Sequence, residues 1–170
     1  MTDAHRFEVF VGEYQDMVFA TAARLLRGSA EAEDVAQAVF LKAFERFDEI
    51  GESPTAGGWL KTVTVNLCLN HLSRYRNRWR LFSELDERDD FDAVDPNAAS
   101  PAANVEFVAR RQRLEQSLRQ LPDRQRVPLV LFHFEELSYQ DIAAALGVSL
   151  GKVKTDIHRG REALRQAMEA

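Results

Sequence analysis

Apolar residues recur at intervals of three and four positions through most of the chain, which is the spacing of one face of an α-helix. Over residues 1–27 this pattern predicts one amphipathic helix, with an apolar face made of Phe7, Phe10, Val11, Tyr14, Val18 and Leu25. Gly28 is suited to end this helix, and Ser29 is suited to cap the next one. The second helix is predicted to bury Val35, Val39, Phe40, Ala43, Phe44 and Phe47.

A third helix is predicted from about Trp59, after a loop at 51–58 in which Pro54 is suited to start the helix. Its polar side chains cluster within about 60° around the helix axis and are those of Thr62, Asn66, Ser73 and Asn77, with Trp59 and Asn70 close by. Asparagine can bind base edges, tryptophan can stack on a base, and Arg74 and Arg76 add positive charge. The stripe is either a site for single-stranded nucleic acid or a solvated face with Trp59 packed in the core.

Helical periodicity is lost between residues 83 and 104, where the sequence is acidic and then rich in small residues and proline. This composition is typical of a flexible linker. The pattern returns near Val105 and predicts further helices, one of which contains Pro128, a residue that indicates a kink or a late helix start. We therefore expect an all-α fold with two small helical domains, 1–82 and 105–170, joined by a flexible acidic linker, 83–104.

The last third of the chain has the pattern of a helix-turn-helix. Ser138 and Asp141 have a spacing similar to that of a capping box at the start of its first helix, and Gly147 lies where the turn requires a positive φ. Ser149 is suited to cap the second helix. The core-facing side of that second helix is predicted to consist of Leu150, Val153, Ile157, Gly160 and Leu164.

The opposite side of this second helix is rich in hydrogen-bond donors and positive charge. Helical geometry places Gly151, Thr155 and His158 at its centre, flanked by Lys152, Lys154, Arg159 and Arg161. Reading the major groove of DNA requires such a face. Asp156, which phosphates would repel, is expected to pair with Lys152 or Arg159. The alternative is a helical hairpin with a solvated basic face.

A third surface is predicted on the second helix of the chain. It is a stripe that lies away from the phenylalanine face and comprises Asp34, Gln37, Leu41 and Glu45. The stripe is either a plain solvated face or a docking face for a basic helix of a partner protein. Spacing does not decide between these two interpretations.

Composition and charge exclude several classes of protein. The chain has 170 residues, a net charge of −5 and 45% hydrophobic residues, as folded globular proteins do. Its one cysteine, Cys68, excludes an internal disulfide framework and is expected to be a core thiol. The four histidines are scattered and lie in no catalytic motif, so we expect no enzyme, no catalytic residue, no metal site and no cofactor. No segment has the pattern of a signal peptide or a membrane span, so we expect a cytoplasmic protein without membrane insertion.

Three stretches, taken together and in this order, resemble the extracytoplasmic-function sigma factors, the small initiation subunits of bacterial RNA polymerase. They are AEDVAQAVFLKAFERF, GGWLKTVTVNLCLNHLSRYR and the C-terminal stretch that begins with LPDRQRVPLVLFHF and ends with GREAL. The resemblance implies that the protein binds core RNA polymerase and promoter DNA and directs promoter-specific transcription initiation. It also implies an anti-sigma factor as a further partner.

The resemblance implies roles for the domains and for individual residues. The first domain would melt the promoter, and the second would read the upstream element. Asp34 and Gln37, with Leu41 on the same stripe, match positions that dock onto core polymerase. Asn66 matches a position that holds a flipped base of the minus-ten element, next to a pocket-forming loop at 53–57. Positions that contact the minus-thirty-five element are matched by Lys154, Thr155, His158 and Arg159.

The alternative function is a stand-alone helix-turn-helix regulator with an N-terminal helical sensor domain. Such a regulator would bind duplex operators tightly without polymerase and would not prefer melted DNA at Asn66. The chain also departs from the family pattern at some positions. Ala38 stands where an acid is common, KTVT (61–64) is less basic and aromatic than usual, and Asp156 replaces a frequent basic residue of the recognition helix.

Overall fold

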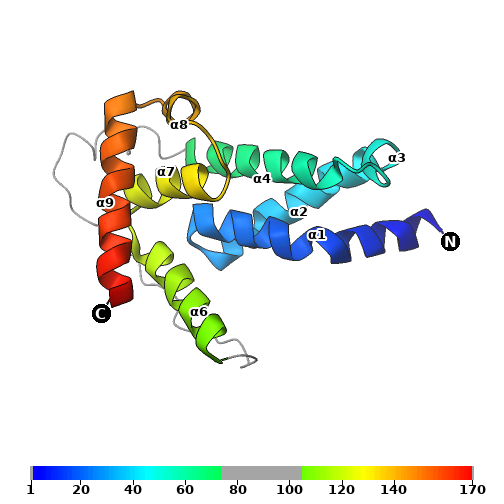
Figure 1. Cartoon of the computed structure of the whole chain (residues 1–170). Coiled ribbons are helices and arrows are strands. Elements are labelled where there is room, and N and C mark those ends of the chain that lie inside the picture. Colours follow the sequence, from blue (N-terminus) through cyan, green and yellow to red (C-terminus); the bar gives the residue numbers. More distant parts are fainter. Residues whose placement is uncertain (1, 74–104, 170) are drawn as a thin grey trace. The chain divides into compact units, whose positions relative to one another are not determined.

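In a computed structural model the chain divides into two compact units. The structure describes residues 2–73, which belong to the first unit, and residues 105–169, which belong to the second. Every regular element in these two ranges is a helix, as Figure 1 shows, so the predicted all-α fold is confirmed. Arg74, Arg76 and the segment 83–104, for which a linker is predicted, lie outside the described residues.

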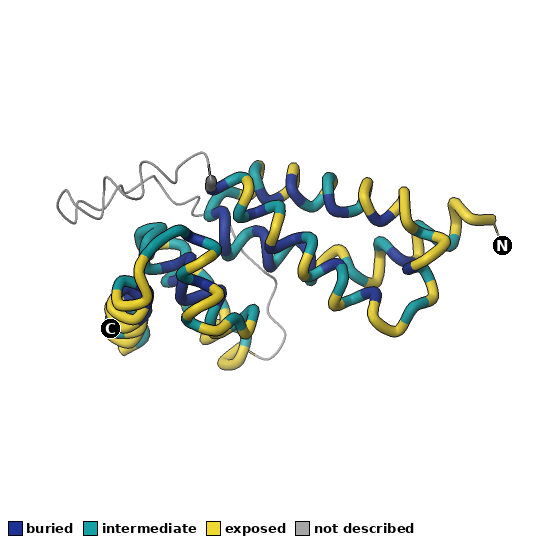
Figure 2. Tube along the Cα trace, turned by 90° about the horizontal axis from the view of Figure 1, so that it is seen from above, coloured by how far each residue is buried: buried dark blue, intermediate teal, exposed yellow. Residues whose placement is uncertain are grey.

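Within residues 2–73, the first unit consists of α1 (Asp3–Leu26), α2 (Ser29–Glu45), α3 (Phe47–Ile50) and α4 (Ala56–Ser73). The long helices α1, α2 and α4 lie alongside one another in Figure 1, and Figure 2 shows buried positions along each of them. The centre of this bundle contains side chains that are fully buried, among them Val18, Leu25, Val39, Leu60 and Cys68. Their burial drives the folding of the unit and confirms that Cys68 is a core thiol.

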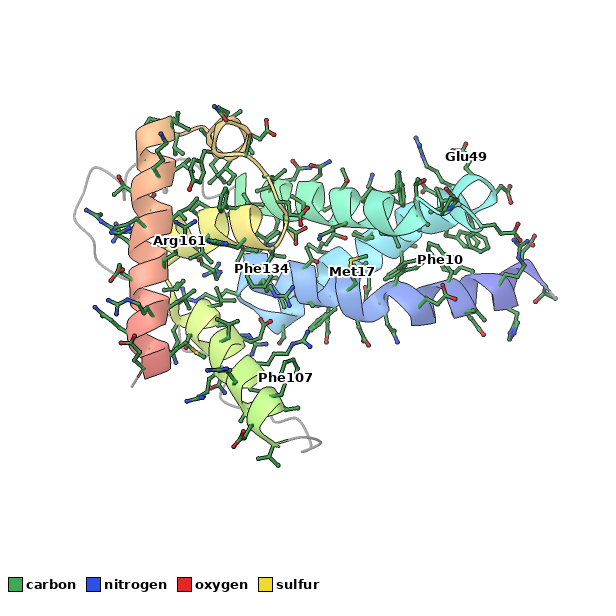
Figure 3. The ribbon with its side chains drawn as sticks, viewed as in Figure 1. Phe10, Met17, Glu49, Phe107, Phe134 and Arg161 are labelled. Carbon is green, nitrogen blue, oxygen red and sulfur yellow. The ribbon has the colours of Figure 1, made fainter. Side chains whose placement is uncertain are left out.

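Aromatic rings close the end of the bundle where α1 begins. Phe47 lies edge-on to Phe7 and to Phe10, which Figure 3 labels, with ring centroids 5.3 and 5.5 Å away. The prediction that Phe44 is buried is wrong, because this residue is 61% exposed. The helix α2 ends at Glu45 and the backbone then turns, so that Phe47 from α3 fills the space between the rings instead.

The connection between α1 and α2 differs from the prediction at both of its residues. Arg27, and not Gly28, follows the last residue of α1 and takes the positive φ of 69°. Gly28 is extended, and its carbonyl accepts a hydrogen bond from the Ala32 amide at 3.0 Å, so it is Gly28 that caps α2. Ser29 is already the first helical residue and makes no capping bond. The stop and the cap therefore each lie one residue earlier than predicted, with Arg27 ending α1 and Gly28 capping α2.

The helix α4 begins three residues earlier than the predicted loop at 51–58 allows. The Ser53 hydroxyl accepts a hydrogen bond from the Thr55 amide at 3.2 Å, and the Thr55 carbonyl accepts one from the Trp59 amide at 3.0 Å. This serine turn fixes the start of the helix at Ala56 and places Pro54 just before it. Trp59 therefore lies in the first turn of α4 and is half-buried.

Within residues 105–169, the second unit consists of α6 (Val105–Gln120), α7 (Asp123–His133), α8 (Tyr139–Leu146) and α9 (Leu150–Glu169). The helix α9 packs against the other three. It approaches α7 closely at Gly160, where an added Cβ would lie 2.9 Å from a methyl group of Leu129. A residue without a side chain is needed at this crossing because the interior is close-packed.

A buried arginine fixes the start of α7. Arg126 is fully buried, and its guanidinium donates to the Leu121 carbonyl at 3.1 Å and pairs with Asp123 at 2.7 Å. These contacts join the end of α6 to the first turn of α7. The helix therefore begins before Pro128 and continues through it, so the predicted late start is wrong.

Candidate nucleic-acid and polymerase interfaces

The turn of the predicted helix-turn-helix is formed by local hydrogen bonds. The Ser138 hydroxyl accepts from the Asp141 amide at 3.1 Å, and the Ser149 hydroxyl accepts from the Lys152 amide at 3.1 Å. Both bonds satisfy amide groups that a helix start leaves without an internal partner. Gly147 has a φ of 69° and a ψ of 35°, the left-handed conformation that glycine adopts without strain. The predicted roles of Ser138, Gly147 and Ser149 are confirmed.

The helix α9 has a buried side and an exposed side. Val153, Ile157 and Gly160 are buried as predicted. Leu150 is 37% exposed, contrary to its predicted place in the core, because it is the first residue of α9 and lies at the open end of the helix. The exposed side contains residues predicted to contact DNA and comprises Gly151, Lys154, Thr155, His158 and Arg159. Their side chains therefore lie on a surface that a DNA duplex can reach.

Lys152 and Asp156 form an ion pair at one edge of this exposed side. The ammonium group of Lys152 donates to a carboxylate oxygen of Asp156 at 2.6 Å. The two side chains are 20% and 5% exposed, respectively. The predicted pairing of Asp156 is therefore confirmed, and its cause is burial, since a buried carboxylate needs a partner.

Arg161, at the other edge, contacts α7, and Figure 3 labels it where α9 meets that helix. Its Nε donates to Nε2 of His133 at 2.9 Å, and its guanidinium lies 5.6 Å from the ring centre of Phe132. Phe132 stacks on Tyr139 of α8, with ring centroids 4.6 Å apart. Sequence reasoning assigned Arg161 to DNA and missed this cluster, because its members come from three helices and have no shared spacing.

His133 makes the stability of the protein depend on pH. Partial burial and the charge of Arg161 lower the pKa of His133 from its ordinary value of 6.5. The unfolded chain therefore takes up a proton at a higher pH than the folded chain does. The stabilisation from the neutral ring is complete above the ordinary pKa and is lost as the pH falls from that value toward the lowered one.

We expect the melting temperature of the full chain to fall between about pH 7.5 and about pH 5.5, and to fall less in the His133→Gln variant. Glutamine can still accept a hydrogen bond from Arg161 but does not titrate. Differential scanning calorimetry of both proteins measures the difference in the pH dependence of their melting temperatures. The contributions of the other histidines cancel in this difference because both proteins contain them. Equal pH dependence of the two melting temperatures would contradict this role of His133.

The part of the predicted single-strand stripe that the structure describes lies along the exposed side of α4, whereas Asn77 lies outside the described residues. Thr62, Asn66 and Asn70 are all exposed, and Trp59 at the start of the same helix is half-buried. Trp59 is therefore partly packed against the unit and partly accessible, which is compatible with both interpretations. The structure brings these polar residues onto one accessible helix face that can meet unpaired bases.

The predicted docking stripe on α2 is also accessible. Asp34 and Gln37 are exposed, and Leu41 is 67% exposed. Phe44, which sequence reasoning assigned to the core, is exposed three residues further along the helix and extends this surface. The spacing of three residues from Leu41 is the signal that could have placed it there. Exposed large apolar side chains beside polar ones are typical of an interaction surface.

None of the described helices combines the length and the apolar character that a membrane span requires.

Comparisons with known proteins identify the family. The Sigma-70 region 2 family model matches residues 10–80, and the model of Sigma-70, region 4 matches residues 111–164. The RNA polymerase sigma-E factor of Streptomyces avermitilis is 32% identical, over 96% of this chain and 86% of that protein. The ECF RNA polymerase sigma factor SigW of Bacillus subtilis is 29% identical, over 98% of this chain and 90% of that protein.

A solved structure shares the fold. The sigma factor RpoE of Bartonella quintana, solved in complex with the anti-sigma factor NepR, matches with a TM-score of 0.51 and 24% identity. The match covers 96% of this chain and 97% of that chain. At this level of identity the comparison shows a common fold.

A helix-turn-helix in one unit and an exposed polar helix face in the other are typical of a nucleic-acid-binding protein. The chain belongs to the extracytoplasmic-function sigma factors of the sigma-70 family. It is an RNA polymerase sigma factor, a factor for transcription initiation that works with core RNA polymerase and promoter DNA. Matches to both sigma regions favour this function over a stand-alone regulator.

Proposed function

We propose that this sigma factor divides promoter recognition between its two units. The second unit binds the minus-thirty-five element through α9, while the first binds core polymerase through α2 and the melted minus-ten element through α4. One observation supports the proposal above all others. Apart from Lys152, the polar side chains of α4 and α9 that the sequence predicts as contacts are exposed in the described residues, while most apolar side chains on the other side of each helix are buried or partly buried.

For the duplex element, we assign the central contacts to the exposed face of α9. Lysine and arginine can contact phosphates or guanine, and threonine can donate to either kind of base edge. Gly151 leaves open space where a side chain would stand, so the start of the helix can come close to the DNA backbone. Lys152 and Arg161 lie at the edges of this face and are held by Asp156 and His133 in the free chain. The assigned contacts are those of Lys154, Thr155, His158 and Arg159.

For the melted element, we assign the central contact to Asn66. Its carboxamide can donate to and accept from the edge of an unpaired base. Trp59, Thr62 and Asn70 lie on the same helix and can stack on or hydrogen-bond to the neighbouring nucleotides. Arg74 and Arg76 follow in the sequence, and we assign their charges to the phosphates of the same strand.

For polymerase binding, we assign the stripe of Asp34, Gln37 and Leu41 on α2. A carboxylate, an amide and an exposed leucine on one helix face can bind a partner helix that carries both basic and apolar side chains. The departure at Ala38, where relatives often have an acid, leaves Asp34 as the acidic group at this end of the stripe.

In this proposal the chain catalyses no reaction, because polymerase synthesises the RNA and the sigma factor selects the promoter at which synthesis starts. The site of action is the cytoplasm, where the polymerase meets the chromosome. An anti-sigma factor is a further partner in the proposal, of the class that NepR represents in the Bartonella quintana complex.

Transcription in vitro with core polymerase, followed by mapping of RNA 5′ ends, tests the proposal. Addition of the chain should move initiation from scattered positions to a fixed start site downstream of its promoters. Failure of the chain to co-purify with core polymerase, together with tight binding to duplex DNA in its absence, would contradict the proposal. That second outcome is what a stand-alone regulator would give.

A further inference from the structure

The ion pair of Lys152 and Asp156 sits in an unusual place for a DNA-binding helix. Lys152 lies in the first turn of α9, where its amide is capped by Ser149. In a helix-turn-helix, the residues at this end of the recognition helix come closest to the DNA. A lysine here is expected to contact a phosphate. In this chain its ammonium group instead donates to Asp156 at 2.6 Å.

Burial makes this pair more persistent than an ordinary surface ion pair. The Asp156 side chain is 5% exposed and the Lys152 side chain 20% exposed. An exposed pair with the lysine on the N-terminal side is the less favourable order along a helix. A carboxylate inside the unit, however, is strongly destabilised without a counter-charge. Lys152 cannot leave for a phosphate without leaving Asp156 buried and unpaired.

We propose that Asp156 is a positioning residue of α9 that weakens the sequence-independent binding of the chain to duplex DNA, because it holds the ammonium group of Lys152 away from the DNA backbone. This inference rests on the proposed function, in which α9 binds duplex DNA. The pair carries no net charge, so Lys152 adds nothing to the attraction for phosphates. That attraction is the part of the affinity that does not depend on DNA sequence.

The consequence is weaker binding of the free chain to every duplex, while its discrimination between base sequences is unchanged. Contacts with base edges depend on the exposed centre of α9, which includes Thr155 and His158 and is unaffected by the pair. One phosphate contact fewer weakens binding to every sequence by the same factor, so stable binding depends more on the contacts that polymerase and the first unit add. Asp156 is thus a positioning residue that acts on DNA through Lys152.

The test compares full-length variants on a short duplex of unrelated sequence, by fluorescence anisotropy between about 50 and about 200 mM salt. Asp156→Asn keeps the shape of the side chain and removes its charge, which frees Lys152. We expect this variant to bind about 3- to 10-fold more tightly at the low-salt end. The logarithmic dependence of affinity on salt should steepen by about 0.9, the value of one additional phosphate contact.

Lys152→Ala and Lys154→Ala are the matched controls, because both remove one lysine from the same helix. In the Asp156→Asn background, Lys152→Ala should abolish the gain and return binding to within about 2-fold of that of the natural chain. Lys154→Ala, which removes an exposed lysine, should weaken binding and lower the salt slope by about 0.9.

Three results would overturn the inference. If the double variant of Lys152→Ala and Asp156→Asn binds as tightly as Asp156→Asn does, the gain does not come from Lys152; Asp156→Leu, which also removes the charge, takes the place of Asp156→Asn if that variant fails to fold. If Asp156→Asn retains the melting temperature of the natural chain but binds DNA no more tightly, the ion pair with Asp156 is not what keeps Lys152 from contacting DNA. If no variant, Lys154→Ala included, changes binding, α9 is not the duplex interface, and the proposed function fails along with the inference.

Discussion

Replacing Asn66 by alanine is expected to slow promoter opening by about 10- to 100-fold, while binding of holoenzyme to the closed promoter changes little. The expectation follows from the position of Asn66 on the exposed side of α4. A contact between a protein side chain and an unpaired base contributes about 1–3 kcal/mol, and this contact exists only after the strands separate. Permanganate reactivity of unpaired thymines measures opening, and footprinting on ice measures closed-complex binding.

Gln15→Ala is the matched control for this experiment. Gln15 is also an exposed amide in the first unit, but it lies on α1, outside every surface assigned to DNA or polymerase. Both substitutions remove a solvent-exposed carboxamide, so neither is expected to change the free energy of unfolding by more than about 0.5 kcal/mol. Equal losses of opening and of closed-complex binding in Asn66→Ala would reject the role assigned to Asn66.

Replacing Leu41 by lysine is expected to weaken binding to core polymerase by about 10- to 100-fold. Leu41 is 67% exposed, so its burial contributes little to the stability of the free chain. An apolar side chain at the centre of an interface commonly contributes about 1–3 kcal/mol to binding, and a lysine there would also face a basic partner surface. Titration of labelled sigma factor with core polymerase measures the affinity.

Val9→Lys is the control for Leu41→Lys, because it makes the same change at an apolar residue that is 48% exposed on α1. Val9 lies two residues from Phe7, whose ring contacts α2, and so it points to a different side of the helix. The melting temperatures of both variants should match that of the natural chain. If Val9→Lys weakens polymerase binding as much as Leu41→Lys does, the effect is one of added charge, and the stripe on α2 is not a docking face.

Several features that depend on residues close in sequence were predicted correctly from the sequence, although the predicted stop at Gly28 and the predicted cap at Ser29 were wrong. The caps at Ser138 and Ser149 each need a hydroxyl and an amide three residues apart, and the left-handed turn needs Gly147. The pairing of Asp156 with Lys152 needs one turn of a helix. Such features are decided within a single turn, so the packing of distant elements does not change them.

Features that depend on how elements meet were not predicted. The contact of Arg161 with His133 joins residues 28 positions apart on two helices, and no spacing rule connects them. Phe44 was expected in the core, but it lies three residues after Leu41 on the exposed side of α2, while Phe47 packs against Phe7 and Phe10 from beyond the break after Glu45. Periodicity identifies an apolar face, whereas packing against neighbours decides which of its residues are buried.

Binding of one promoter by the full chain alone and by the holoenzyme, at the same salt concentration, tests the central claim most directly. The claim is that each unit binds weakly and that polymerase makes the pair selective by holding both units on one stretch of DNA. The holoenzyme should prefer the promoter over a scrambled duplex by about 1,000-fold or more, and the chain alone by less than about 10-fold. If the chain alone selects the promoter as strongly as the holoenzyme does, the claim is wrong.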